Sequence, residues 1–295
     1  MRQDNFDFFQ HKMHLISVYQ ETMKVAMTGH YTAPDGTIVE LGSDREMREN
    51  SRFYSRPFTV FDIPAHREPT EVALLPTDSI SAGKQLIDEG YNPVVLNFAS
   101  RRNAGGGVIN GARAQEESLF RCTNLFRSLY QFMPYAEQYG VEKNRRQYPL
   151  DVRFGGVYTP YATVFRESKN NDYTLLSHPF KLSFIAVAAI NRHDPDGKRK
   201  PLTDEEVALT LSKMRTIFRI GLLHGHDALA LGAFGCGAFS NPPRQIAQLF
   251  QQVMGEPEFK NKYRKIVFPV IDDHNRHGVS NYDAFREVLL DQDKR

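Results

Sequence analysis

The chain has 295 residues, of which 41% are hydrophobic and 24% charged, and its formal net charge is +2. This size allows a large core, and the balanced charge provides no basic field for nucleic acid, so we expect no direct sequence-specific nucleic-acid binding. The sequence has no apolar run of about 18 residues, so no membrane span is predicted. Residues 1–12 lack the apolar core that is typical of a secretory signal. With only Cys122 and Cys236, we expect a cytoplasmic protein, or a nuclear one in a eukaryote.

Elements are predicted from periodicity in chain order. The first 60 or so residues are expected to be a polar helical lead-in, with a helix in 14–27 and a turn at 32–37. Strands are then predicted at 71–75, 92–98, 183–190, 228–234 and 265–271, with paired strands at 155–159 and 162–167. Helices are predicted at 81–90, 115–133, 203–224, 243–254 and 282–290. Strands alternating with helices predict a sheet covered on both faces.

The first notable motif is NAGGGVINGARAQEE, at 103–117, which follows the predicted strand 92–98. In such sheets ligands bind beyond the carboxyl ends of the strands. Gly105, Gly106 and Gly107, with Val108 after them, permit close backbone approach and predict a loop whose amides face an anion, usually phosphate. A flexible turn is the alternative interpretation.

A second glycine loop, GAFGCGAFSNPP at 232–243, also joins a predicted strand to a helix. Ser240 or Asn241 is expected to cap that helix, and the prolines suit its first turn. Two such loops predict a diphosphate held between them. Neither loop is a Walker motif or a dinucleotide fingerprint.

Glu116 and Glu117 fall in the first turn of a predicted helix, where the helix dipole alone favours acids by about 0.3–1 kcal/mol. Beside a phosphate loop, however, two negative charges repel the ligand unless they act on it. Adjacent helical side chains point about 100° apart. We therefore expect one carboxylate to bind sugar hydroxyls and the other to act as an acid or base.

GGGVINGARAQEE resembles the GGG and QEE signature of the poly(ADP-ribose) glycohydrolases, which are macrodomain proteins, and GCGAF at 235–239 resembles their diphosphate loop. The order of VLNFAS, GGVYTPYATVFRE and VFPVIDD is similar to that of the microbial branch. The resemblance implies a three-layer α/β/α macrodomain-like fold with a mixed sheet. It also implies a helical N-terminal extension (1–65), a catalytic domain (66–295), and hydrolysis of ribose–ribose bonds in poly(ADP-ribose) to release ADP-ribose.

The resemblance also implies roles for individual residues. Glu117 would be the catalytic acid and base, and Glu116 would orient the ribose. Asn97 and Gln115 would support them. The diphosphate would lie on the backbone of the second loop, with Phe239 on the distal ribose; the residues concerned are Gly235, Cys236, Gly237, Ala238 and Phe239. No cofactor and no metal are implied.

Several alternatives stay open. The same residues suit a hydrolase of mono-ADP-ribosylated protein or nucleic acid, or a non-enzymatic ADP-ribose-binding macrodomain, although a binder has no use for two acids near phosphate. Two further hypotheses are Cys236 as a nucleophile and a metal site formed by His224 and His226 with 272–274. The adenine site is poorly marked, with 77–80 and 270–275 as candidates.

Overall fold

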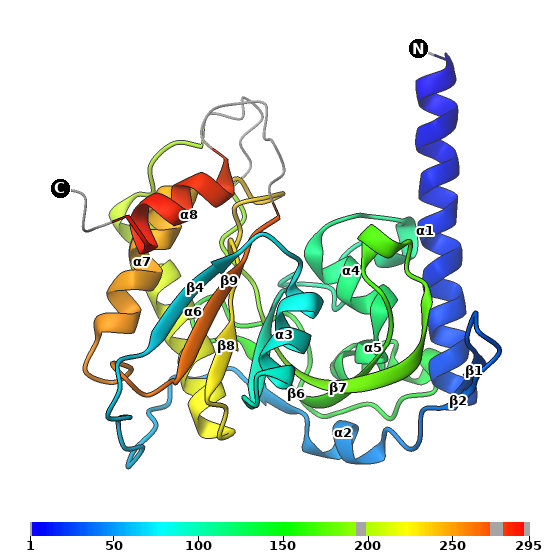
Figure 1. The fold of residues 1–295 in the computed structure, drawn as a ribbon, viewed down its shortest axis with the longest axis horizontal. Helices are drawn as coiled ribbons and strands as arrows, with labels where there is room; N and C mark the ends of the chain where they lie inside the picture. Colours follow the sequence, from blue (N-terminus) through cyan, green and yellow to red (C-terminus); the bar gives the residue numbers. More distant parts are fainter. Residues whose placement is uncertain (1, 193–198, 272–279, 292–295) are drawn as a thin grey trace. The chain divides into compact units, whose positions relative to one another are not determined.

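The structure, a computed structural model, describes residues 2–192, 199–271 and 280–291, with side chains from residue 7 onward. The expected mixed sheet flanked by helices and the expected N-terminal helix are confirmed (Figure 1). In the described part of the chain, seven strands belong to this sheet and two form a separate hairpin. The chain forms two compact units that interleave along the sequence. The division predicted at 65/66 stays a prediction.

The first unit comprises residues 1–53, 99–149 and 157–184. Its strands have the order β3-β6-β7 in the sheet. Its main elements are α1 (Arg2–Thr28), β1 (His30–Thr32), β2 (Ile38–Glu40), α2 (Arg45–Asn50), β3 (Arg52–Tyr54), η1 (Val108–Asn110), α4 (Gln115–Cys122), α5 (Leu125–Leu129), η2 (Tyr130–Phe132), η3 (Ala136–Tyr139), β6 (Gly156–Arg166), η4 (Lys169–Asn171) and β7 (Leu175–Val187).

Helix α1 is anchored by its second half. Leu15, Val18 and Tyr19 are buried, whereas residues 7–14 are all exposed. The Thr22 hydroxyl donates to the carbonyl of Arg121 at 2.6 Å, which fixes α1 beside α4 (Figure 1). The helix predicted in 14–27 is thus confirmed, and it begins earlier, at Arg2.

The single helix predicted over 115–133 is wrong, because the chain breaks it into α4, α5 and η2. Thr123 is extended (φ −139°, ψ 167°) and forms an antiparallel bridge with Val164. The side chain of Asn124 accepts from the amide of Thr163 at 2.8 Å. These bonds to β6 interrupt the helix at residues 123 and 124, and apolar spacing carries no sign of them.

The prediction of two paired strands at 155–159 and 162–167 is also wrong, because one strand, β6, runs through both. Tyr161 takes a left-handed conformation (φ +48°), but the chain does not reverse there. Its amide donates to the hydroxyl of Ser183 at 3.2 Å. Strand β7 likewise begins at Leu175, well before the predicted 183. Sequence reasoning also missed β1, β2, β3 and α2, which are short.

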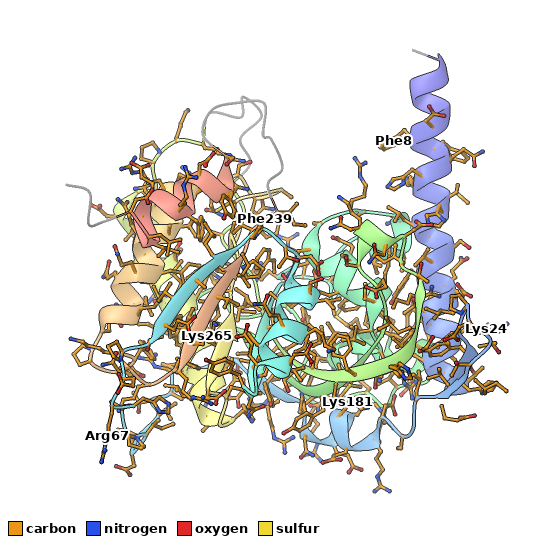
Figure 2. The ribbon with its side chains drawn as sticks, viewed as in Figure 1. Phe8, Lys24, Arg67, Lys181, Phe239 and Lys265 are labelled. Carbon is orange, nitrogen blue, oxygen red and sulfur yellow. The ribbon has the colours of Figure 1, made fainter. Side chains whose placement is uncertain are left out.

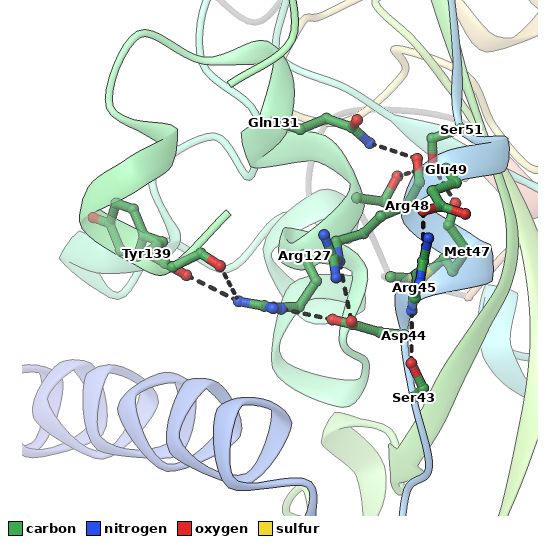
Figure 3. Close-up of polar contacts among 12 residues, drawn as sticks. Ser43, Asp44, Arg45, Met47, Arg48, Glu49, Ser51, Arg127, Gln131 and Tyr139 are labelled. Carbon is green, nitrogen blue, oxygen red and sulfur yellow. Dashed lines mark hydrogen bonds and ion pairs between the residues drawn. The ribbon is translucent and has the colours of Figure 1, made fainter. Parts of the chain in front are cut away.

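Helix α2 is attached to α5 by a polar cluster, drawn in Figure 3. Asp44, just before α2, accepts from Arg127 Nε at 2.6 Å and from Arg48 Nε at 3.0 Å. Arg127 also donates to the carbonyls of Tyr139 and Gly140 at 3.1 and 2.9 Å. This guanidinium therefore connects three separate segments of the first unit.

The second unit comprises residues 54–98, 150–156 and 185–295. Its strands are parallel in the order β5-β8-β9-β4, with Val95 opposite Ala230 and Ala230 opposite Val267. Its elements are β4 (Glu71–Leu75), α3 (Ser79–Asp88), β5 (Pro93–Phe98), α6 (Asp204–Leu223), β8 (Ala228–Ala230), α7 (Pro243–Gly255), β9 (Lys265–Pro269) and α8 (Asn281–Leu289). The four predicted strands and four predicted helices of this region are confirmed, although β8 is shorter than predicted.

Local sequence explains these helices. Asp78 accepts from the amides of Ile80 and Ser81 at the start of α3. Thr203 and Glu206 form a capping box at the start of α6. Gly221 makes room for its neighbours, because a Cβ there would lie 2.4 Å from the Tyr263 hydroxyl and 3.2 Å from the side chain of Leu229 in β8. No helix among the described residues is both long and apolar enough to span a membrane.

Candidate active site

The triple glycine holds the two glutamates through its own amides. Glu116 accepts from the amide of Ser100 at 2.7 Å on one oxygen and from the amide of Gly105 at 3.0 Å on the other. Its side chain is buried. The loop amides thus face a carboxylate of their own chain. The prediction that the amides of this loop are free for an anion is not supported, because the amides of Gly106 and Val108 also have backbone acceptors.

Glu117 is held differently from Glu116. One of its carboxylate oxygens accepts from the amide of Gly107 at 2.9 Å. The other is buried and has no hydrogen-bond partner among the residues that the structure describes. A buried polar atom without a partner is unfavourable unless a ligand or water supplies one. The prediction that the two acids divide their tasks therefore has a geometric basis: Glu116 is fully engaged at both oxygens, whereas Glu117 keeps one oxygen available.

The glycines are required by space as well as by conformation. Gly105 and Gly106 have φ of +80° and +57°. A Cβ on Gly106 would lie 2.4 Å from the bound oxygen of Glu117, and one on Gly105 would lie 2.6 Å from the ring of Phe120. Only residues without a side chain let this backbone reach the carboxylates.

A buried arginine links the glycine loop to α1 by hydrogen bonds. Arg121, one turn after Glu117 in α4, is fully buried. It donates to the carbonyl of Leu15 in α1 at 3.1 Å and to the carbonyl of Ala112 at 2.5 Å. Sequence reasoning missed this residue. The signal was a cation between the apolar residues of α4, because a buried guanidinium needs acceptors, which two backbone carbonyls supply here.

The charge of Glu116 acts on two tyrosines of the first unit, Tyr135 and Tyr148. Burial raises the pKa of Tyr135 to about 12, and the charges of Tyr139 and Glu116 add to the shift. Burial also raises the pKa of Tyr148 well above its ordinary value, with the charge of Glu116 contributing. The hydroxyl of Tyr148 is buried without a partner among the described residues. Both tyrosines therefore stay protonated at neutral pH.

The other predicted site residues in this region have these surroundings. Val108 is buried in η1, and Gln115 is half-buried at the first position of α4. Asn97 belongs to the second unit, in β5, and is fully buried. Neither polar atom of its side-chain amide has a partner among the described residues. An amide in this state is prepared for a ligand or water.

The second loop presents free backbone amides. Gly237 and Ala238 are exposed and Phe239 is half-buried. The amides of these three residues donate to no other described residue. Consecutive free amides form a concave site for anions. Phe239 is labelled in Figure 2, and its carbonyl accepts from the amide of Arg192 at 3.1 Å.

Gly235 and Asn241 shape this loop. Gly235 has φ +75°, and a Cβ there would lie 2.4 Å from the side-chain nitrogen of Asn241. The predicted helix cap by Ser240 or Asn241 is wrong. The N-cap is Pro242, because Asn241 instead donates to the carbonyls of Ile190 and Gly235 at 2.8 and 3.1 Å. Pro243 at the first turn is confirmed.

The alternative chemistries find little support. Cys236 is fully buried, and its thiol donates to the carbonyl of Phe234 at 3.7 Å. Burial lowers the pKa of His226 to about 4, and its ring contacts the carbonyl of Asn92 at 3.1 Å. His224 contacts the hydroxyl of Tyr54 at 2.8 Å. No cluster of three metal-ligating side chains occurs among the described residues. Residues 272–274 and most of the candidate adenine segment 270–275 lie outside the described residues.

Comparison with protein families decides the identity of this loop. A model of the microbial-type PARG, catalytic domain, matches residues 19–167, about half of the chain, including both glutamates. The chain belongs to this family. The microbial-type PARG match covers the whole loop from Ser100 to Glu117, and the loop at 235–239 lies beyond it. A search of curated proteins found no match.

Solved structures extend the similarity over the chain. Poly(ADP-ribose) glycohydrolase from Thermomonospora curvata is 25% identical with a TM-score of 0.75, covering 93% of this chain and 99% of that one. Its complex with the inhibitor ADP-HPD is 26% identical with a TM-score of 0.73, covering 92% and 98%. The Deinococcus radiodurans enzyme in complex with ADP-ribose is 27% identical with a TM-score of 0.67, covering 86% and 100%. The likeness to these PARG structures thus includes the region of the second loop.

Proposed function

We propose that the chain is a poly(ADP-ribose) glycohydrolase that cleaves the ribose–ribose O-glycosidic bond of poly(ADP-ribose) and releases ADP-ribose. The observation that carries this proposal is the single unpartnered carboxylate oxygen of Glu117 in a loop that belongs to the microbial-type PARG family. Support also comes from the relatives, of which one is described in complex with ADP-ribose.

Glu117 serves as acid and then as base in this proposal. Its free oxygen carries the proton that passes to the 2′ oxygen of the leaving ribose while the bond from that oxygen to the anomeric carbon breaks. The anomeric carbon gains oxocarbenium character. A water molecule attacks this carbon, and the Glu117 carboxylate takes a proton from that water. One water is consumed, the leaving unit regains its hydroxyl, and Glu117 ends protonated as it began.

Glu116 and the glycine loop position Glu117 and the ribose. Because both oxygens of Glu116 hold loop amides, this residue fixes the loop and offers its remaining lone pairs to ribose hydroxyls. Asn97 and Gln115 are proposed as further ribose contacts. Asn97 supports this role by its unpartnered side-chain amide.

The diphosphate is proposed to lie on the second loop. The free amides of Gly237, Ala238 and Phe239 provide donors without a protein acceptor, and Phe239 offers a ring for the distal ribose. Gly235 and Cys236 are buried and are proposed to support the loop beneath these exposed amides. Backbone donors recognise a diphosphate without adding a positive side chain.

The test is to incubate the protein with labelled poly(ADP-ribose) and, separately, with protein carrying single ADP-ribose groups, and to identify the products. Release of free ADP-ribose from the polymer, with single groups left on the protein, is expected. Release of single groups without polymer cleavage favours the mono-ADP-ribosyl hydrolase. Binding of ADP-ribose without any turnover favours the non-enzymatic reader.

A further inference from the structure

An exposed aromatic and cationic surface lies beside the catalytic loop within the first unit. Phe8 and Phe9 of α1 are each 58% exposed, and Ile109 of η1 is 52% exposed. The guanidinium of Arg113 lies 5.6 Å from the centre of the Phe8 ring. Figure 2 shows Phe8 in the part of α1 remote from Lys24. We call these four residues, Phe8, Phe9, Ile109 and Arg113, the α1–η1 surface.

This surface lies beside the loop that binds the glutamates, because η1 follows that loop in the chain and packs against α1. The amide of Gly107, which binds Glu117, is two residues before Ile109. Gly111 lies so close to α1 that a Cβ there would be 2.8 Å from the carbonyl oxygen of Lys12. Phe8 is one turn from Lys12, about 6 Å along the helix axis, on the same face. Exposed rings therefore lie next to the loop whose amide binds Glu117.

Resting on the proposed function, we infer that the α1–η1 surface binds the adenosine of the unit that leaves when the glycosidic bond breaks. In poly(ADP-ribose) the oxygen that Glu117 protonates is the 2′ oxygen of an adenosine. The adenine is bonded to the neighbouring carbon of that ribose, so it remains within a few ångströms of the scissile bond. The base must lie against whatever surface adjoins the glutamate.

The chemistry of the surface fits this occupant better than a second copy of the chain. Aromatic side chains that stack on bases and cations that follow phosphates are the combination that proteins use for single-stranded nucleotide polymers. Arg113 already stacks with Phe8, which leaves the other face of that ring for adenine. Arg102, also exposed on the catalytic loop, adds a second positive charge for the diphosphate of the leaving unit. A purely apolar dimer contact requires neither arginine.

The test compares Phe8→Ala, Phe8→Tyr and Arg113→Gln with wild type on a dimer of two ADP-ribose units. Two measurements are made on each protein: kcat/KM for cleavage of the dimer, and the Kd of monomeric ADP-ribose. Met27→Ala and Lys24→Gln are matched controls, because Met27 is also 58% exposed and both lie at the other end of α1. Light scattering monitors the oligomeric state of each variant.

We expect kcat/KM for the dimer to fall about tenfold in Phe8→Ala, at the lower end of what base–aromatic stacking contributes. It falls similarly in Arg113→Gln, while Phe8→Tyr and both controls match wild type and the Kd of ADP-ribose is unchanged throughout. The inference is overturned if Phe8→Ala is as active as wild type or if it also loses ADP-ribose binding. It is also overturned if the wild-type protein forms a homodimer that Phe8→Ala dissociates. A wild type that leaves the dimer of ADP-ribose uncleaved overturns the proposed function instead.

Discussion

The unequal environments of the two glutamates predict unequal effects of removing their charges. In Glu117→Gln the amide oxygen still accepts from Gly107, so the loop is expected to keep its conformation. Turnover should fall by about 100- to 10,000-fold, the usual contribution of a general acid–base group. ADP-ribose should bind as before. Kinetics on labelled polymer and calorimetry with ADP-ribose measure the two effects.

Glu116→Gln should behave in the opposite way and serves as the matched control. A glutamine has one acceptor oxygen, so its NH₂ group would face the amide of either Ser100 or Gly105, both donors. We expect loss of stability by about 1–3 kcal/mol and weaker ADP-ribose binding. If Glu117→Gln weakens binding as much as Glu116→Gln does, the division of roles is wrong.

Gly106 should tolerate no side chain, because a side chain would collide with Glu117. A matched glycine variant separates this collision from the cost of the positive φ. Gly106→Ala places a Cβ 2.4 Å from a Glu117 oxygen, whereas Gly42→Ala, at a similar positive φ of +71°, meets nothing within 4 Å. Both variants should lose about 1 kcal/mol in urea unfolding from the left-handed φ. Only Gly106→Ala should also lose activity, because it displaces the Glu117 carboxylate that we propose acts as acid and base. Equal activity in both variants would refute this reason for the triple glycine.

At the scale of elements, the ion pair that joins α2 to α5 offers a matched comparison (Figure 3). The side chains of Asp44 and Arg127 are only 16% and 14% exposed. Burial raises the pKa of Asp44, but Arg127 and Arg48 outweigh it and hold the pKa below its ordinary value. Asp44→Ala leaves a largely buried guanidinium without its carboxylate and should cost about 3 kcal/mol.

Glu49→Ala is the control for this pair. Arg45 and Glu49 form an ion pair within α2 in which the side chains are 75% and 59% exposed. Its loss should leave the free energy of unfolding unchanged, because water and salt screen an exposed pair. Urea denaturation of both variants gives the comparison, and an Asp44→Ala variant as stable as Glu49→Ala would show that the cluster does not hold α2 in place.

The turn between α6 and β8 should make stability depend on pH. Burial lowers the pKa of His226 to about 4, although the carbonyl of Asn92 and the charge of Asp227 act to raise it. The unfolded state therefore binds a proton below about pH 6.5 that the folded state refuses, so stability is lost as the pH falls. The loss should reach about 2 kcal/mol at pH 5 and about 3 kcal/mol below pH 4. Urea unfolding at pH 7 and pH 5, for wild type and His226→Asn, measures it; an equal loss in the variant would contradict this assignment.

How well the elements could be predicted depended on whether their causes are local. Helix α6 has both its apolar spacing and its capping box in its own sequence, and it was predicted almost to its ends. The break at Thr123 depends on a bridge to Val164, some 40 residues away. The continuous strand β6 depends on a bond from Tyr161 to Ser183. Contacts of this kind leave no periodic signal, so propensity gave the wrong result.

At the scale of the whole molecule, the α/β fold class was predictable from the alternation of strands and helices. The spacing in 103–117 drew attention to Glu116 and Glu117, but the glycine amides were expected to face an anion and instead bind the two carboxylates. Which amide binds which oxygen was not predictable, nor was the support from Arg121 and α1, more than 90 residues earlier in the chain. The interleaving of the two units also follows from long-range contacts, which a single sequence does not reveal.

Binding of ADP-ribose should be visible in the stability of the whole molecule, independently of turnover. A ligand at 100 times its Kd stabilises the folded state by about 2.7 kcal/mol, which corresponds to a rise in Tm of about 4 °C for a chain of this length. Wild type and Glu117→Gln should shift equally.

Gly237→Ala should melt like wild type without ligand, because a Cβ there meets nothing within 4 Å and φ is not positive. With ADP-ribose its shift should be smaller, since the Cβ crowds the free amides at the proposed diphosphate site. Gly255→Ala, equally unobstructed at the end of α7, is the control and should keep the full shift. A full shift in Gly237→Ala would remove the second loop from the binding site, while a lowered melting point without ligand would mean that Gly237 serves the fold.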